Sequence, residues 1–522
     1  MGWGDPAQVP VLPDTVLALL RDGLGVRAPA AASPDPESIV LPEVRSTPEA
    51  RAALSAIVGA EHVRDDHATR LAHTRGRSTP DLLRLRAGDA GDAPDFVVFP
   101  ASHEAVLEIL GLASRERIAV VPYGGGTSVV GGLECSSAQL TGVLALDMRR
   151  LNALIDLDEE SRLATLEPGL RGPQAEALLG ERGYTLGHFP QSFQYASLGG
   201  FAAARSSGQA SFGYGRFDEL VMALRVATPV GTLALGRAPR SAAGPDLRQL
   251  LLGSEGALGV ITALTLQIRP SPAVRRYEGW RFASFRAGTA ALRALAQAGP
   301  RPTVLRLSDE AETAVSLADP DALGGGGTGA LAIVGYEGSE DDVAVRSAAG
   351  AAALASHGAT RQDGAGESWE RGRYQGPYLR DALLDAGALV ETLETACFWS
   401  ALPALYARVT EAIREALTAQ GTPPVILCHV SHVYAAGASL YFTIACAQTQ
   451  DPVAQWRAAK TAASEAILAT GASITHHHGV GRDHRDAYLR EIGDVGVRAL
   501  RAVKRELDPA GILNPGVLLP EP

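Results

Sequence analysis

Three glycine-rich segments most constrain how this 522-residue chain can fold. The first reads Pro122-Tyr-Gly-Gly-Gly-Thr-Ser128, the second begins Ser197-Leu-Gly-Gly200, and the third reads Gly253-Ser-Glu-Gly-Ala-Leu-Gly-Val-Ile261. Each lies at the edge of a predicted strand, where glycines allow the backbone to turn its N–H groups inward with no Cβ in the way. Together they predict a sheet domain whose backbone approaches one extended ligand.

The first segment has the composition of a phosphate-binding nest, since Thr127 and Ser128 add hydroxyl donors to its N–H groups. Taken alone, the segment could equally be a tight structural turn. It is not a Walker loop, because no Gly-Lys-Ser/Thr follows, and the Gly-x-Gly-x-x-Gly spacing of Rossmann folds is absent. A dinucleotide has the length to reach all three segments, so we expect a ligand of that class.

Strands and helices alternate around these segments. A buried strand at 95–100, a helix from Ser102 and a strand at 118–121 predict a β–α–β unit that ends in the first segment. This half also has a helical stretch at 46–68, strands at 143–147 and 163–167, a helix at 172–182 and a hairpin at 224–235. After about residue 271 the pattern changes to strands at 331–336, 425–434 and 438–445 among Ala-rich helices at 339–357, 401–419 and 452–470. Two main domains joined near Pro270-Ser-Pro272 are therefore expected.

Charge and cysteine use exclude several classes of protein. The 47 basic and 58 acidic residues leave a net charge of −11, which argues against nucleic acid as a partner. The four cysteines form no Cys-x-x-Cys pair, so we expect reduced, buried thiols rather than a disulfide frame or a zinc site. No basic segment followed by an apolar one opens the chain, and no apolar run reaches about 18 residues, which disfavours secretion and membrane spanning. We expect a soluble cytoplasmic protein and a homodimer, and peripheral contact with a membrane stays open.

The order of four motifs, PYGGGTS, GHFPQSFQYASLGG, GSEGALGVITALTLQIRP and DPAGILNPG, resembles the FAD-binding type of the vanillyl-alcohol oxidase superfamily. Within it the chain is similar to the alkylglycerone-phosphate synthase (alkyl-dihydroxyacetone-phosphate synthase) branch. That narrower likeness is carried by His73-Thr-Arg-Gly, Pro302-Thr-Val-Leu-Arg-Leu307, Tyr378-Leu-Arg-Asp381, Ala438-Ser-Leu-Tyr-Phe442 and Thr475-His-His-His-Gly-Val-Gly481.

The resemblance implies an α+β fold, with a two-subdomain FAD-binding domain of the vanillyl-alcohol oxidase type and an α+β cap that binds substrate. The implied divisions are a partly helical N-terminal extension at 1–90, the FAD-binding domain at 91–270, the cap at 271–475, and a segment at 476–522 that returns to the FAD domain.

The resemblance also assigns residues to FAD. Residues 122–128 would cradle the pyrophosphate, residues 190–196 and 203–207 would flank the flavin and its diphosphate, and residues 255–261 would hold the adenosine and ribose. The implied cofactor-binding residues are Pro122, Gly124, Gly125, Gly126, Thr127, Ser128, Pro190, Ser192, Ser197, Gly199, Gly200, Arg205, Ser207, Glu255, Gly256, Leu258, Gly259, Val260 and Ile261.

For catalysis the resemblance implies that Tyr441 is the proton donor and acceptor, that Arg306 is needed for activity, and that Arg380 binds a substrate phosphate. It places His476, His477 and His478 in the active site. In that branch the acyl group of acyl-dihydroxyacetone phosphate is exchanged for a fatty alcohol in ether lipid synthesis, without net redox change and through an adduct at flavin N5. The resemblance therefore implies that this chain acts on a small-molecule or lipid substrate.

The residues themselves allow both functional and structural interpretations. Removing a proton beside a ketone requires a base and a cation or donor for the enolate charge. Tyr441 lies among apolar residues of a predicted strand, so it is a candidate base or a core tyrosine. Arg380 suits bidentate contact with a phosphate but could form a surface ion pair with Asp381. Arg306 lies between two leucines on a strand and must point away from them.

The three consecutive histidines are predicted on a strand or turn, where side chains alternate, so at most His476 and His478 should share a face. An imidazolium among them could counter the effect of burial on the pKa of Tyr441. Zinc binding and a purely structural tract are the alternatives. No Cys, Asp or further His lies at ligand spacing nearby, so no metal is expected.

Two other functions stay open at the level of sequence. The first is an FAD-dependent oxidase or dehydrogenase of a 2-hydroxy acid or other small alcohol, and the second is a flavin-binding protein without catalysis. One departure from the synthase pattern bears on the site: Pro190-Gln-Ser192 replaces Pro-Asp-Ser and removes a carboxylate near the flavin.

Overall fold

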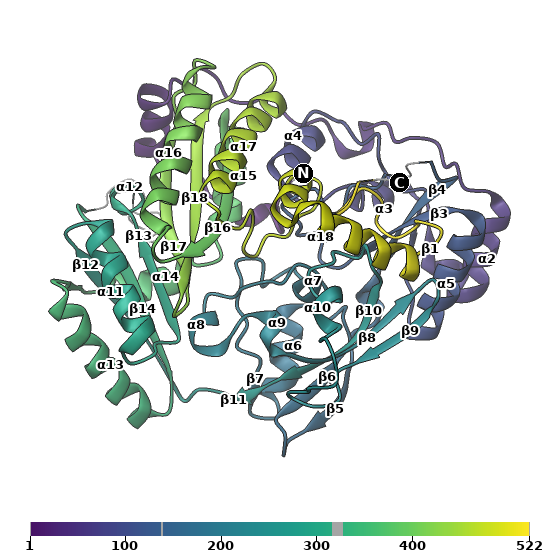
Figure 1. Ribbon diagram of the computed structural model, residues 1–522. Coiled ribbons are helices and arrows are strands. Elements are labelled where there is room, and N and C mark those ends of the chain that lie inside the picture. Colours follow the sequence, from purple (N-terminus) through teal and green to yellow (C-terminus); the bar gives the residue numbers. More distant parts are fainter. Residues whose placement is uncertain (1, 137–138, 316–326, 521–522) are drawn as a thin grey trace.

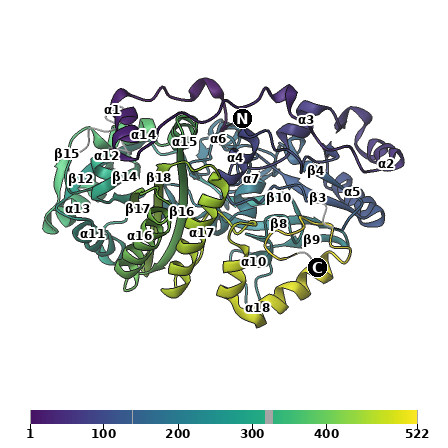
Figure 2. The same ribbon diagram turned by 90° about the horizontal axis from the view of Figure 1, so that it is seen from above.

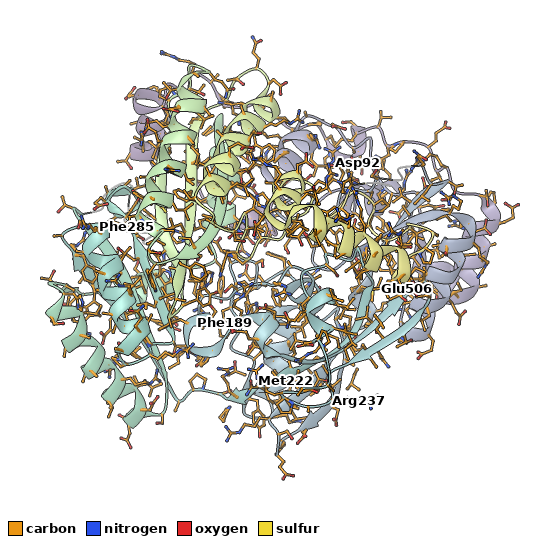
Figure 3. All side chains as sticks on the ribbon, in the orientation of Figure 1. Asp92, Phe189, Met222, Arg237, Phe285 and Glu506 are labelled. Atoms are coloured by element: carbon orange, nitrogen blue, oxygen red, sulfur yellow. The ribbon has the colours of Figure 1, made fainter. Side chains whose placement is uncertain are left out.

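The computed structural model describes residues 2–136, 139–315 and 327–520. Figure 1 shows two halves side by side, one built on two sheets that contain the glycine segments and the other on a single large sheet. Phe189, labelled at their boundary in Figure 3, packs against a buried cluster that includes Val304 and Ile333 of the large sheet. The two halves therefore share a packed boundary.

The first sheet has four strands in the order β1 (Val63–Arg64), β2 (Phe96–Val98), β4 (Gly142–Asp147) and β3 (Ile118–Tyr123). The predicted β–α–β elements are present, but β4 lies between β2 and β3 and runs parallel to both. Helix α5 (His103–Glu116) connects them, and the Ser102 side chain caps it by accepting a hydrogen bond from the Ala105 N–H. Its apolar stripe is buried, as its spacing predicts.

The second sheet is antiparallel, in the order β5 (Leu154–Asp158), β6 (Leu163–Leu166), β10 (Val260–Gln267), β8 (Val221–Thr228) and β9 (Gly231–Leu235). The predicted hairpin is confirmed as β8–β9, and its turn uses Gly231 with φ of 135°. Helices α6 (Gly172–Gly180) and α7 (Leu198–Ala203) share a hydrophobic core with this sheet.

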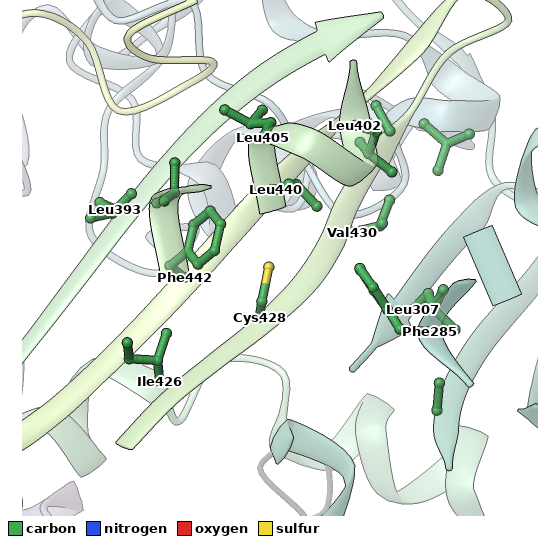
Figure 4. Close-up of a cluster of buried hydrophobic side chains, with 14 of the residues drawn as sticks. Phe285, Leu307, Leu393, Leu402, Leu405, Ile426, Cys428, Val430, Leu440 and Phe442 are labelled. Carbon is green, nitrogen blue, oxygen red and sulfur yellow. The ribbon is translucent and has the colours of Figure 1, made fainter. Parts of the chain in front are cut away.

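The large sheet has seven strands in the order β15 (Thr360–Gln362), β12 (Val274–Phe282), β14 (Ala330–Gly338), β13 (Val304–Ser308), β17 (Val425–Val433), β18 (Gly437–Ala447) and β16 (Ala388–Phe398). Helices α11 (Phe285–Ala298), α13 (Glu340–Ser356), α16 (Leu402–Thr418) and α17 (Pro452–Ala469) pack against it. Figure 4 shows Leu402 and Leu405 of α16 on the side of Leu440 and Phe442. Because strand residues alternate, Tyr441 faces the opposite side, toward the first half.

Two long strands of this sheet were not predicted. Strand β12 reads VRRYEGWRF and β16 reads ALVETLETACF, so charged residues interrupt the apolar pattern of both. In β16 these charges are Glu391 and Glu394, which are buried. Charged residues inside a strand are rare enough that periodicity alone does not indicate one.

The N-terminal and C-terminal segments each pack against both halves of the molecule. Helix α1 (Asp14–Ala18) and the turn after it place Val16 and Leu20 in a buried cluster with Val390 of the large sheet. Figure 2 shows the N-terminal segment running along one side of both halves, with α18 (Arg485–Leu507) on the other side. The last described residues return to the first sheet, where the Asn514 N–H donates to the Val120 carbonyl at 2.9 Å.

The stretch at 46–68 is only partly helical, because α2 (Pro48–Val58) ends at Gly59, whose φ is 91°. A short 3-10 turn (Ala60–His62) and β1 follow it. The remaining elements are α3 (His67–Ala72), α4 (Thr79–Arg86), α8 (Ser211–Tyr214), α9 (Phe217–Leu220), α10 (Arg248–Leu251), α12 (Glu310–Val315), α14 (Ala365–Gly372), α15 (Gly376–Asp385), β7 (Tyr184–Thr185), β11 (Arg269–Pro270) and short turns at Pro6–Gln8, Leu19–Gly23, Pro36–Ser38 and Met148–Arg150.

Two expectations about the chain as a whole can be compared with the structure. The four cysteines are free thiols, three of them buried and Cys397 half-buried. Among the residues that the structure describes, no helix is both long enough and apolar enough to cross a bilayer.

Candidate active site

A cavity of about 630 Å³ lies where the two halves meet. One wall is formed by the three glycine segments, and the opposite wall is the face of the large sheet that α11, α13, α16 and α17 leave uncovered. We call this second wall the cavity face; Arg306, Thr392, His429 and Tyr441 lie on it. A third, apolar part of the lining includes Pro10, Val11, Leu12, Pro13, Leu379, Leu383 and Val390.

The first glycine segment is packed so closely that no side chain fits. A Cβ on Gly125 would collide with the Tyr195 carbonyl, and a Cβ on Gly124 would collide with the Ser197 hydroxyl. Gly126 has φ of 71°, a conformation that favours glycine. In the described structure no backbone N–H of residues 124–127 donates a hydrogen bond. These free donors line the cavity and form a nest for an anion.

Most of the residues predicted to bind FAD line this one cavity. They are Pro122, Gly124, Gly125, Gly126, Thr127, Ser128, Pro190, Ser192, Ser197, Gly199, Gly200, Ser207, Glu255, Gly256, Gly259, Val260 and Ile261. Arg205 and Leu258 are not among the lining residues. Leu258 is fully buried in the core of the second sheet, and Arg205 donates to the Leu252 carbonyl and pairs with Asp218 at 3.1 Å. The free N–H nest and the extended glycine-lined wall fit a dinucleotide that carries a pyrophosphate.

Glu255 joins this wall to the segment that carries the histidines. Its buried carboxylate accepts hydrogen bonds from the Val480 and Gly481 N–H groups, each at 2.9 Å. Burial raises the pKa of Glu255 to about 7, although these two bonds lower it in part. Its backbone has φ of 50°, which is rare outside glycine.

Arg306 forms part of a buried charge cluster on the cavity face. Its guanidinium donates to Glu312 and contacts His429 Nδ1 at 3.2 Å, and His429 Nδ1 lies 2.8 Å from the other oxygen of Glu312. Burial alone raises the pKa of Glu312, but His429 and Arg306 lower it to about 2. Glu312 and His429 were not predicted; an acid six residues after Arg306 was the only signal in the sequence.

Tyr441 lies directly beside this cluster. Its ring stacks on that of His429, and the rings of His477 and His478 lie 6.1 and 5.5 Å from it. Burial raises the pKa of Tyr441 to about 12, while a hydrogen bond with Thr392 and the charge of Arg380 lower it in part. The phenol is therefore protonated at neutral pH.

The histidine tract lies in a bend, and the expectation that only His476 and His478 share a face is wrong. The Nδ1 atoms of His476 and His477 are 3.0 Å apart. The backbone curls around Glu394, which accepts hydrogen bonds from the N–H groups of all three histidines. A strand would turn successive N–H groups to opposite sides and could not do this. His477 and His478 line the cavity, whereas His476 is not among the lining residues.

His432 of β17 joins the tract and was not predicted. Ring nitrogens of His432, His476 and His477 all lie within 4.8 Å of one another, close enough to hold a metal ion. Two of the rings also have protein partners: His432 Nδ1 contacts the Ser211 hydroxyl at 2.9 Å, and His476 Nε2 contacts the Tyr434 hydroxyl at 2.6 Å. Spacing along the sequence could not reveal the cluster, because the large sheet brings His432 to it.

Arg380 is buried and borders the cavity. Its Nη1 donates to the Arg77 carbonyl at 2.9 Å, and in the described structure Nε and Nη2 have no hydrogen-bond partner. The nearest acid, Asp381, lies 4.0 Å from Nε. Burial lowers the pKa of Arg380, and nearby acids only partly restore it. A buried cation with two free donors is a binding site for an anion.

The N-terminal segment closes the apolar part of the cavity. The Trp3 N–H donates to Asp381, and the Trp3 ring meets that of Tyr195 edge-on at 6.1 Å. Tyr195 in turn contacts Tyr378 through their hydroxyls at 2.7 Å. Nothing in the weak periodicity of the first residues predicted this role.

Comparisons with known proteins agree with these observations. The model of the FAD binding domain family matches residues 94–235, and the model of the C-terminal domain of FAD linked oxidases matches residues 271–518. An alkyldihydroxyacetonephosphate synthase of Dictyostelium discoideum is 33% identical over 506 residues, which are 93% of this chain and 83% of that protein. The enzyme of the same name from Trypanosoma brucei brucei is 33% identical over 90% of this chain and 80% of its own.

Solved structures of related proteins resemble this chain in fold. One alkyldihydroxyacetonephosphate synthase superposes with a TM-score of 0.80 at 28% identity, over 96% of this chain and 92% of that one. A p-cresol methylhydroxylase superposes with a TM-score of 0.70 at 17% identity, over 91% and 96% of the two chains, and this likeness concerns the fold alone.

Proposed function

The chain belongs to the alkyldihydroxyacetonephosphate synthase family of FAD-dependent enzymes, and from this premise we propose that it exchanges the acyl group of acyl-dihydroxyacetone phosphate for a fatty alcohol. The observation that carries the proposal is the Arg380 guanidinium. Two of its nitrogens are unpartnered in the described structure, and it lines the cavity that also holds the anion nest and the apolar part of the lining. One cavity thus offers a place for a cofactor pyrophosphate, a substrate phosphate and an alkyl chain.

FAD would lie along the glycine wall. The free N–H groups of residues 124–127 and the hydroxyls of Thr127 and Ser128 would hold its pyrophosphate. Glu255, Gly256 and residues 259–261 would border its adenosine, and Pro190 with Ser207 would flank the flavin. When bound, FAD supplies an electrophilic centre to the substrate carbon, and the protein supplies orientation and charge.

Arg380 would bind the substrate phosphate. Burial strengthens the attraction between guanidinium and phosphate, and the free Nε and Nη2 can bind two phosphate oxygens at once. The phosphate would then hold the dihydroxyacetone carbons at a fixed place in front of Tyr441.

Tyr441 would move the proton. Its raised pKa keeps the phenol protonated at rest, so it becomes a base only by passing that proton to a neighbouring imidazole such as His477. The phenolate would take a proton from the substrate carbon beside the ketone and return one to that carbon after the alcohol oxygen has replaced the acyl oxygen. The acyl group would leave as a carboxylate, and the proton of the alcohol would balance its charge. Arg306, held by Glu312 next to His429, supplies positive charge for the enolate that develops.

The fatty alcohol would enter through the apolar part of the cavity. Val11 belongs to that lining and is also 94% exposed, so it stands at the mouth, with Leu17 and Leu19 exposed in the segment that follows. These side chains are suited to peripheral contact with a lipid surface. We also propose that the protein is cytoplasmic and forms a homodimer. We propose further that the chain divides into parts at 1–90, 91–270, 271–475 and 476–522.

The test is the exchange reaction itself. The purified holoprotein should transfer labelled fatty alcohol into acyl-dihydroxyacetone phosphate and release the fatty acid while its flavin stays oxidised over many turnovers. An FAD-linked oxidase or dehydrogenase would instead bleach the visible flavin band on anaerobic mixing with its substrate. Bleaching by D-lactate or glycolate, with no exchange of label, would contradict the proposal.

A further inference from the structure

We propose that Glu394 is a positioning residue for the reaction: it gathers the backbone of the histidine tract onto one carboxylate and so holds the rings of His477 and His478 against Tyr441. This inference rests on the proposed function, because it concerns how that function's proton-transfer group is supported. Neither the motifs of the sequence nor the lining of the cavity includes Glu394.

The position of Glu394 in the sheet is the first observation. It lies on β16 directly opposite Tyr441 of β18, so both side chains are on the cavity face. Glu394 is fully buried and does not line the cavity, whereas Tyr441 beside it does. A buried acid beside a proton-transfer group needs a strong reason to be charged.

The hydrogen bonds supply that reason. Oε1 accepts from the Thr475 hydroxyl at 2.6 Å and from the N–H groups of His477 and His478 at 3.1 and 2.9 Å. Oε2 accepts from the His476 N–H at 2.5 Å. Burial by itself raises the pKa of Glu394, but the neighbouring imidazoles and the Thr475 bond lower it well below its usual value. Four donors aimed at two oxygens require a carboxylate, since a protonated or amide group would turn a donor toward one of them.

The arrangement fixes the histidine rings as well as the backbone. His477 Nδ1 lies 3.6 Å from Glu394 Oε2, and His478 Nδ1 lies 3.9 Å from Oε1. Both rings contact Tyr441, and they contact each other at 4.7 Å between centroids. The negative charge of Glu394 also makes these buried imidazoles more basic than burial alone would leave them.

Glu394→Gln is the decisive variant, because it keeps the shape of the side chain and removes its charge. The matched control is Glu391→Gln, which removes a buried carboxylate from the same strand. Glu391 lies three positions away and so on the opposite face, where it accepts a hydrogen bond from Trp456. Thr475→Val is a second variant; it removes one of the four donors and leaves the carboxylate in place.

Two readouts are needed, and one of them is independent of turnover. The first is the steady-state exchange of labelled fatty alcohol by the holoprotein. The second is the pH titration of the imidazoles followed by NMR of histidine-labelled holoprotein. Other titratable or charged groups around the tract, unchanged in these variants, are His429, His432, Tyr441, Arg216, Lys460 and His484.

Glu394→Gln should lower kcat about 100-fold with little change in KM, because the proton-transfer group loses its support and the phosphate site does not. His477 and His478 should titrate at lower pH than in the wild type. Thr475→Val should shift both readouts in the same direction by less. Glu391→Gln controls the NMR readout: it should leave the titration of His477 and His478 unchanged even where it lowers the melting temperature.

Unchanged titration of both imidazoles in Glu394→Gln would overturn the proposal, as would a loss of kcat no larger than the loss of folded holoprotein. If Glu394→Gln does not fold, Thr475→Val decides by the same criteria. Should the wild type exchange no fatty alcohol at all, the proposed function fails, and the NMR titration still decides whether Glu394 organises the tract.

Discussion

The rings of Tyr441 and His429 stack with their centroids 4.9 Å apart and their planes 16° apart. The two residues are paired across β17 and β18, so the sheet fixes this contact. His429 in turn joins Tyr441 to Arg306 and Glu312. The proton-transfer group and the cation that would stabilise negative charge are therefore parts of one rigid cluster, and the predictions below separate their contributions.

Tyr441→Phe should remove the exchange reaction almost completely, by about 10²- to 10⁴-fold in kcat, because it deletes only the hydroxyl that carries the proton. Tyr336→Phe is the matched control: Tyr336 is fully buried away from the cavity, and its hydroxyl has no partner in the described structure. Steady-state exchange measures both variants. If Tyr441→Phe retains full turnover, the tyrosine has a structural role only.

Arg380→Lys should weaken binding of the phosphorylated substrate while leaving FAD bound. Lysine keeps the charge but loses the two-pronged contact, which costs about 1.5–3 kcal/mol, or about 10- to 150-fold in kcat/KM. Arg276→Lys serves as the control, because Arg276 is exposed and contacts Ser347. An unchanged KM for the phosphorylated substrate would exclude Arg380 from the phosphate site.

Gly125→Ala should yield protein without flavin, because the new Cβ would collide with the Tyr195 carbonyl. Gly180→Ala adds the same methyl group at an exposed helical position where nothing lies within 4 Å, so it should retain FAD. The flavin-to-protein absorbance ratio after purification measures the difference. Equal flavin content in the two variants would contradict the placement of the pyrophosphate.

Glu312→Gln should alter how stability depends on pH. The folded-state pKa of Glu312 is about 2 and its reference value is 4.5, so its contribution is present above about pH 4.5 and lost as the pH falls toward 2. The variant should be less stable by about 3 kcal/mol at neutral pH, and the difference should vanish under acid conditions. Urea unfolding at several pH values tests this, and a difference that stays constant with pH would show that Glu312 is uncharged.

The purified protein should contain no stoichiometric metal. Ring nitrogens of His432, His476 and His477 already have hydrogen-bond partners in Ser211, Tyr434 and each other. Elemental analysis of holoprotein prepared without chelator provides the test. One zinc or other transition metal per chain, lost together with activity on dialysis against a chelator, would make the cluster a metal site.

Sequence reasoning succeeded where local chemistry decides structure. The capped helix α5 and the hairpin β8–β9 follow from Ser102 and Gly231, which act within a few residues of themselves. It failed at β16, because buried charges such as Glu394 are stabilised by a segment far along the chain. The same cause hid His429 and His432, which are placed by pairing between strands, and Glu312 of α12, which meets His429 from another part of the chain.

The cavity takes walls from both ends of the chain, with Trp3 and residues 10–13 on one side and His477 and His478 on another. During synthesis these segments are made far apart in time, since translation proceeds at about 5–20 residues per second. A ribosome-bound chain that has its glycine segments still lacks the histidine tract and the Glu255 contacts beyond it. Capture of the cofactor in its final setting thus requires that synthesis has passed residue 481, so a product truncated before that point lacks part of the site.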